Sequence, residues 1–190
     1  MKIVKTLSFL AFSFVVLQAS AQNNVPKGFN KGSLVLADNS TVSGYVKDNM
    51  KRDASVILLT DGKEKSYNGS DLFSAEINSN SFLCIKGDFF KVVCTGDLSF
   101  LQKSSDASSQ ASYNGTEPMF NNGTEGTPGD YFIYDNRSKE LKLVSKKNVN
   151  EVAAKTFDGY APAIEKARTA QTDIAMLKEA IEIYNGRKGK

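Results

Sequence analysis

Turn-forming residues recur about every eight to twelve positions between Asp38 and Asp97, and this spacing constrains the fold more than any other feature of the chain. The segments between the turns are short and are either apolar or alternating, as in β-strands: 33–37, 41–47, 55–60, 73–77, 82–86, 89–94 and 98–103. No helical segment separates them, which excludes a parallel doubly wound sheet. The spacing predicts an antiparallel sandwich, a barrel or a strongly curled sheet, extended by a last hairpin over residues 130–144.

After Val144 the apolar period changes from that of strands to that of helices. Asn148 and Glu151 have the spacing of a reciprocal N-cap, so a first helix is expected between them and Gly159. Pro162 suits the first turn of a second helix. A third helix carries one apolar stripe, which we expect to dock on the sheet: Ile174, Leu177, Ile181 and Tyr184. The predicted fold class is α+β, a curled antiparallel β-sheet (sandwich or barrel-like) followed by C-terminal helices.

The first 21 residues have the pattern of a secretory signal peptide. Lys2 and Lys5 precede an apolar run over residues 7–17, and Ala19-Ser20-Ala21 supplies small residues at a cleavage point. Gln22, and not a cysteine, follows that point, so no lipid anchor is expected. No later apolar run is long enough to span a membrane as a helix. The sequence therefore predicts a periplasmic or secreted protein.

The remainder is predicted to be one domain with short polar ends: a polar lead (22–31), a single α+β domain (32–186) and a basic tail (187–190). Residues 104–129 consist mainly of Ser, Asn, Gly, Thr and Ala, so they cannot bury enough apolar surface to order themselves. They are expected to form a flexible insert. The functional alternative is a lid or binding loop that contacts a ligand through Tyr113, Met119 and Phe120.

The chain contains no histidine. This excludes Ser-His-Asp and Cys-His catalysis and every metal site that depends on histidine. No phosphate-binding loop or calcium loop occurs, and two cysteines alone cannot complete a zinc site, so neither a cofactor nor a metal is expected. Loss of Lys2 and Lys5 with the signal peptide lowers the net charge from +3 to +1. Such a balance gives no field that would attract nucleic acid.

Cys84 and Cys94 flank a predicted hairpin whose turn we place at Gly87-Asp88. In this register the two sulfurs point apart, whereas a shift of one residue or a bulge would bring them to one face. Two alternatives therefore stay open, a disulfide between Cys84 and Cys94 or two small buried side chains, and the second is preferred.

Phe89 and Phe90 are adjacent on the second strand of this hairpin, so their rings must lie on opposite faces. One ring is a candidate for lining a cleft or a subunit contact, and packing in the core is the alternative. With the three insert residues they complete the candidate binding set: Phe89, Phe90, Tyr113, Met119 and Phe120.

A histidine-independent hydrolase is the rival to a binding function, because a glycosidase needs only two carboxylates at a suitable distance. Most acidic residues lie between predicted strands, where aspartate is favoured because its side chain bonds the local backbone. Acids converging in an aromatic-lined cleft would favour the hydrolase. Acids dispersed in turns would favour a binding module.

The order of several short motifs resembles that of uncharacterised secreted β-rich proteins of Bacteroidetes-type bacteria. The motifs are Gly32 to Lys47 (GSLVLADNSTVSGYVK), Tyr67 to Leu72, Phe89 to Val93, Gly96 to Phe100, Tyr131 to Ile133, and Tyr184-Asn185. The resemblance implies a β-rich fold and localisation in the cell envelope, and it assigns no catalytic residue. The long 104–129 insert departs from the pattern.

These observations favour an exported, soluble cell-envelope protein that acts as a non-catalytic binding or interaction module. Its expected partner is an envelope protein or a glycan. The alternative is the hydrolase with a carboxylate pair, directed at a glycan.

Overall fold

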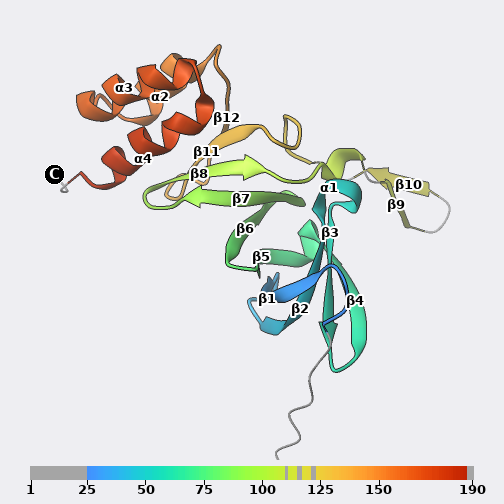
Figure 1. The fold of residues 1–190 in the computed structure, drawn as a ribbon. Coiled ribbons are helices and arrows are strands. Elements are labelled where there is room, and N and C mark those ends of the chain that lie inside the picture. Colours follow the sequence, from blue (N-terminus) through green and yellow to red (C-terminus); the bar gives the residue numbers. More distant parts are fainter. Residues whose placement is uncertain (1–24, 110, 115–116, 121–122, 188–190) are drawn as a thin grey trace, which may run out of the picture.

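The computed structural model describes residues 25–109, 111–114, 117–120 and 123–187. One antiparallel sheet of ten strands dominates it, in the order β12-β11-β8-β7-β6-β5-β1-β2-β3-β4 (Figure 1). The strands of this sheet are β1 (Phe29–Leu36), β2 (Thr41–Asn49), β3 (Ser55–Thr60), β4 (Lys63–Asn68), β5 (Leu72–Ile77), β6 (Asn80–Ile85), β7 (Asp88–Cys94), β8 (Leu98–Lys103), β11 (Tyr131–Asp135) and β12 (Leu141–Val144). Short helical turns α1 (Met50–Asp53) and η1 (Gly69–Asp71) precede β3 and β5.

The sheet consists of two runs of consecutive hairpins. Strands β1 to β4 form the first run, and β5 to β8 continue into β11 and β12 as the second. Strand β1 joins the runs because it pairs with β2 on one side and with β5 on the other. The sheet curls but does not close, since β4 and β12 are its two edges. The predicted α+β class with a curled antiparallel sheet is confirmed.

Apolar side chains form three clusters on the two faces of the sheet. The first fills the curl of β1 to β7 and contains Leu34, Val46 and Phe89. The second lies between the sheet and the C-terminal helices and contains Phe100 and Leu177. The third lies on the opposite face: Phe90, Leu101 and Phe132, surrounded by half-buried apolar residues. The sheet is therefore covered by helices on one face near β8 and has a separate cluster behind it.

The C-terminal segment forms α2 (Val149–Thr156), α3 (Ala161–Ala167), η3 (Arg168–Gln171), η4 (Ile174–Met176) and α4 (Leu177–Asn185). All four residues of the predicted stripe, Ile174, Leu177, Ile181 and Tyr184, are buried against the sheet, as expected. The Asn185 side chain fixes the end of α4, because it accepts from the Leu98 N–H at 3.0 Å and donates to the Leu98 carbonyl at 2.8 Å. No helix in the described ranges is long and apolar enough to cross a membrane.

Three local predictions differ from the structure. The turn between β6 and β7 is at Lys86-Gly87, one residue earlier than expected, because both residues adopt the positive φ that a tight hairpin turn needs. Asn148 does not cap α2, since its amide bonds Ser145 and the Leu143 carbonyl. Glu151 instead pairs with Lys155.

The insert is not a loop throughout. It contains the short helical turn η2 (Ala107–Ser109) and a separate hairpin of β9 (Ala111–Asn114) and β10 (Glu117–Phe120). The segments on either side of this hairpin are bonded to strands β7 and β8, as described below. The described segments beside this hairpin are held by buried polar contacts, which the low apolar content of the insert did not indicate.

Candidate functional site

Phe89 and Phe90 are not available to a ligand, because both side chains are fully buried. Phe89 packs in the curl of the sheet, and Phe90 packs edge-on against Phe132 in the cluster on the other face. The predicted placement on opposite faces is confirmed, and both rings pack in the core, which is the alternative to lining a cleft or a subunit contact. Tyr113 lies on β9, and Met119 and Phe120 lie on β10. The positions of their side chains fall outside the described part of the chain.

Cys84 and Cys94 are free thiols that pack in different clusters, the first in the curl and the second beneath the helices. Cys84 lies opposite Phe89, because the turn begins one residue earlier than predicted. Burial raises the pKa of Cys84 to about 12, and it also raises the pKa of Cys94. Neither thiol is therefore activated as a nucleophile.

Asp88 and Lys103 form a fully buried ion pair on β7 and β8, with 3.2 Å between Nζ and Oδ2. One oxygen of Asp88 accepts from the Ser105 hydroxyl and the Ala107 N–H. The other accepts from both the N–H and the hydroxyl of Thr124, each at 2.7 Å. Burial raises the pKa of Asp88, but these donors together with Lys103 outweigh it, and the pKa is lowered overall. Asp88 is therefore held as a carboxylate.

The Lys103 ammonium is equally well satisfied. Besides Asp88 it donates to three consecutive carbonyls, those of Thr124, Glu125 and Gly126, at 2.8, 3.2 and 3.0 Å. We call Asp88, Lys103, Ser105 and Thr124 the clasp, because they tie both ends of the insert to the sheet. All the polar atoms of this ion pair bond groups of the protein itself. The pair is therefore a structural element and has no free donor or acceptor for a ligand.

Seven further aspartates are dispersed over turns and the ends of strands and helical turns. Each bonds a residue within three positions of it or a nearby arginine: Asp38 with Ser40, Asp48 with Met50, Asp53 with Arg52, Asp71 with Asn68, Asp97 with Arg137, Asp130 with Thr127 and Asp135 with Ser138. Within the described ranges no three Cys, Asp or Glu side chains are grouped so that they could hold a metal ion. Most of these carboxylates therefore have the turn role that their positions predicted.

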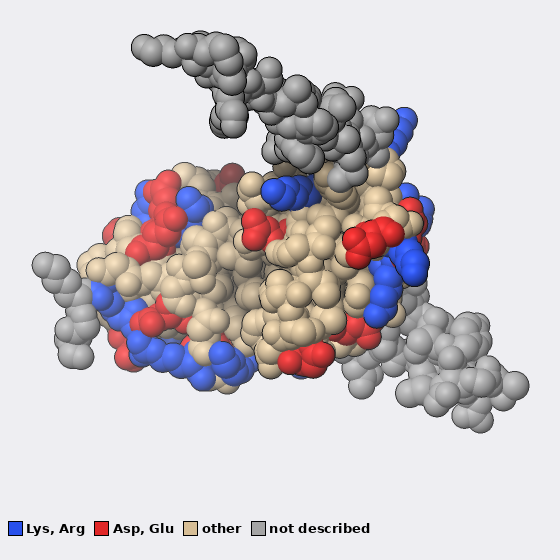
Figure 2. Space-filling view, turned by 90° about the horizontal axis from the view of Figure 1, so that it is seen from below, with Lys and Arg blue, Asp and Glu red and all other residues tan. Residues whose placement is uncertain are grey.

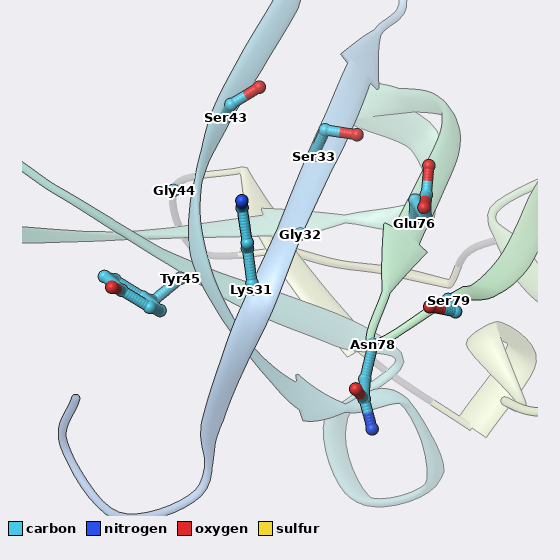
Figure 3. Close-up of a pocket in the computed structure, with 9 residues that line it drawn as sticks. All are labelled: Lys31, Gly32, Ser33, Ser43, Gly44, Tyr45, Glu76, Asn78 and Ser79. Atoms are coloured by element: carbon cyan, nitrogen blue, oxygen red, sulfur yellow. The ribbon is translucent and has the colours of Figure 1, made fainter.

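A hollow of about 830 Å³ lies over β1, β2 and β5, where the two runs of hairpins meet. Its described lining is polar apart from two glycines: Lys31, Gly32, Ser33, Ser43, Gly44, Tyr45, Glu76, Asn78 and Ser79. Lys31 pairs with Tyr45 across β1 and β2, and Ser33 pairs with Ser43 and with Glu76. Because alternate residues of a strand share a face, these five side chains lie on one face of the sheet. Figure 3 shows Lys31 between Tyr45 and Glu76.

Gly32 and Gly44 lie opposite one another between these side chains. A Cβ on Gly32 would lie 2.3 Å from the Glu76 carbonyl, and a Cβ on Gly44 would lie 2.5 Å from the Leu59 carbonyl. Only glycine permits so close an approach of neighbouring strands. The glycine pair therefore allows the sheet to bend at the hollow and forms part of its backbone lining.

The polar side chains of the hollow are not used by the protein itself. Within the described part of the chain, no hydrogen bond or ion pair engages the side chains of Lys31, Ser33, Ser43, Tyr45 and Glu76. Lys31 and Glu76 give the hollow one charge of each sign, and Glu76 is the one carboxylate among its described lining residues. The arrangement offers hydroxyls, an amide, an ammonium, a carboxylate and one aromatic ring to a ligand.

The sequence indicated part of this site. The alternation of Ser43, Tyr45 and Lys47 with Val42 and Val46 predicted a strand with one polar face. Lys31 was placed in the polar lead, but it lies on β1, which begins at Phe29. Glu76 could not be assigned to the site, because the pairing of β5 with β1 joins segments separated by five other elements.

Comparison of the chain with protein-family models, with curated proteins and with solved structures gives no match. The geometry of the hollow is therefore the basis for its interpretation.

Proposed function

We propose that the protein is an exported binding module of the cell envelope that holds a neutral glycan in the hollow over β1, β2 and β5, without hydrolysing it. Export rests on the signal-like residues 1–21 and on the resemblance to secreted proteins of Bacteroidetes-type bacteria. The observation that carries the binding function is the set of polar side chains that line one hollow together with the Tyr45 ring and have no partner in the described part of the chain.

The chemistry of the hollow favours a sugar over other ligands. A sugar ring presents hydroxyls around its edge and apolar C–H groups on its faces, which suits polar side chains beside an aromatic ring. Lys31 and Glu76 cancel in charge, so the hollow has no preference for a strongly acidic or basic molecule. Figure 2 shows that Lys and Arg are mixed with Asp and Glu around the margin of the face in view, which therefore has no large surface of one charge sign.

A binding role is favoured over hydrolysis by the number of carboxylates. Glycosidases use a pair of acids that flank the scissile bond. The described lining of the hollow holds Glu76 alone, and the acids in turns bond their own neighbours. A ligand in the hollow would therefore meet one carboxylate and no partner acid.

The experiment is a titration of the chain lacking residues 1–21 with N-acetylglucosamine oligomers of one to six units, by isothermal calorimetry. The acetamido group has a carbonyl that can accept from Lys31 and an N–H that can donate to Glu76, which matches the two charges. Tyr45→Ala, Lys31→Ala and Glu76→Gln are each expected to weaken binding about tenfold, which is about 1.4 kcal/mol.

Lys155→Ala and Glu151→Gln on α2 are matched controls, since they remove one charge of each sign from an exposed site on another element. The oligomers are also incubated with the protein and analysed for shorter products. Absence of binding, or equal losses in the control variants, would refute the proposal. Release of shorter sugars would replace it by the hydrolase.

A further inference from the structure

Phe73 is the most exposed large apolar side chain of the described residues, at 60% of its accessible area. It lies on β5, the strand that supplies Glu76 to the hollow. The other exposed large apolar residues, Val25, Met176 and Ile183, range from 38% to 42%. Phe73 therefore presents an aromatic ring to solvent on an element of the proposed site.

A β-bulge is the cause of this exposure. Val35 of β1 pairs with Ser74 and Leu36 pairs with Leu72, so that Phe73 is left without a partner in the ladder. In an uninterrupted strand Phe73 would share a face with Ala75 and Ile77, which are buried. The bulge places Leu72 in the core instead and turns the larger Phe73 ring outward.

Phe73 lies on one of the strands that carry the hollow. Glu76 pairs with Ser33, and the next pair of that face along the ladder is Ser74 with Val35, which is adjacent to the bulge. At about 3.3 Å per residue, Phe73 is about 10 Å from Glu76 along β5. This distance exceeds the length of one sugar ring, so a single sugar in the hollow could not also contact Phe73.

We infer that the ligand is a linear oligosaccharide whose chain runs from Tyr45 and the hollow along β5 to the ring of Phe73. This inference rests on the proposed function and adds a second subsite to it. A flat aromatic ring at each end would stack on two different sugar units, while the polar side chains between them bond the hydroxyl and acetamido groups. The affinity then depends on the length of the chain.

The test uses the same N-acetylglucosamine oligomers of one to six units with the chain lacking residues 1–21. The affinity is expected to rise at least tenfold from the shortest oligomer that binds to the hexamer. Phe73→Ala is expected to abolish this rise and to leave the affinity for the shortest binding oligomer unchanged. Phe73→Tyr is expected to restore the rise, because it restores a flat ring. Ile183→Ala on α4 is the matched control for loss of an exposed apolar side chain.

The outcomes separate the two proposals. If the affinity does not change with length, or if Phe73→Ala weakens every oligomer equally, the second subsite is refuted and the hollow stands. If the unaltered chain binds no oligomer, the proposed function fails and this inference fails with it. Phe73 is exposed, so Phe73→Ala should unfold at the same urea concentration as the unaltered chain, and that measurement accompanies the titrations.

Discussion

The sheet carries two pairs of opposite charges that differ in how far the protein itself satisfies them. In the clasp, Asp88 and Lys103 are fully buried, and their polar atoms bond one another, Ser105 and the insert. In the hollow, Lys31 and Glu76 are exposed and have no partner in the described ranges. The clasp leaves no bonding capacity for a ligand, whereas the hollow leaves the side chains of Lys31 and Glu76 free within the described ranges, and the proposed binding function rests on this difference.

Substitutions in the clasp should lower the stability of the protein more than the other substitutions considered below. Asp88→Ala leaves the Lys103 ammonium buried without its counter-ion, which is expected to lower the free energy of unfolding by about 3–5 kcal/mol. Urea denaturation followed by circular dichroism measures this. The double variant Asp88→Asn, Lys103→Met removes both charges and should recover more than half of the loss. A loss below about 1 kcal/mol in Asp88→Ala would mean that the pair does not hold the insert.

The glycine backbone of the hollow should contribute to the stability of the fold, whereas the polar side chains of the hollow should not. Gly32→Ala places a methyl group against the Glu76 carbonyl, so the strands must shift, at an expected cost of about 1–3 kcal/mol. The neighbouring variant Ser33→Ala removes a hydroxyl that the protein does not use and should change the stability by less than about 0.5 kcal/mol. Thermal unfolding of both variants tests the contrast. Equal melting temperatures would contradict the close approach of β1 and β5.

Acid should weaken the clasp only below the pH at which an ordinary aspartate is protonated. The pKa of Asp88 is lower in the folded protein than its ordinary value of 3.8. Its contribution to stability is therefore present above that value and is lost as the pH falls through the folded pKa. Urea midpoints measured from pH 7 to pH 2 should fall less steeply below pH 3.8 in Asp88→Asn than in the unaltered chain. Parallel curves would show that Asp88 does not titrate with folding.

An exposed ion pair should contribute least to the stability of the protein, although its charged atoms are closer together than those of Asp88 and Lys103 in the clasp. Lys155 and Glu151 are separated by 2.7 Å on the surface of α2. Lys155→Ala is expected to leave the free energy of unfolding unchanged within the error of the measurement, because water screens the pair. Chemical denaturation at low and high salt measures this. A loss comparable with that of Asp88→Ala would remove burial as the reason for the strength of the clasp.

Most of the fold could be predicted because it depends on local signals. The hairpins follow from turn residues such as Asp61-Gly62, and α4 follows from the spacing of Leu177, Ile181 and Tyr184. The structure explains why a glycine begins the motif Gly96 to Phe100. Gly96 leaves room for the Asn185 side chain, which bonds the Leu98 backbone and so docks the last helix on β8.

The clasp and the hollow could not be predicted, because each brings together residues that are distant in the sequence. Asp88 follows a glycine and has the pattern of a turn residue, and nothing in its neighbourhood points to Lys103 or Thr124. Glu76 enters the hollow only through the pairing of β5 with β1. The bulge that exposes Phe73 interrupts the alternation of β5, and nothing in the local sequence marks its position.

The position of β1 between the two runs of hairpins has a consequence for the order of folding. Each run can form from neighbouring segments as they become available, but β1 keeps one edge unpaired until β5 has been added. The hollow takes side chains from both sides of that last junction. A ligand bound there would contact the sheet only after β5 has paired with β1, and it would therefore stabilise the pairing that joins the two runs.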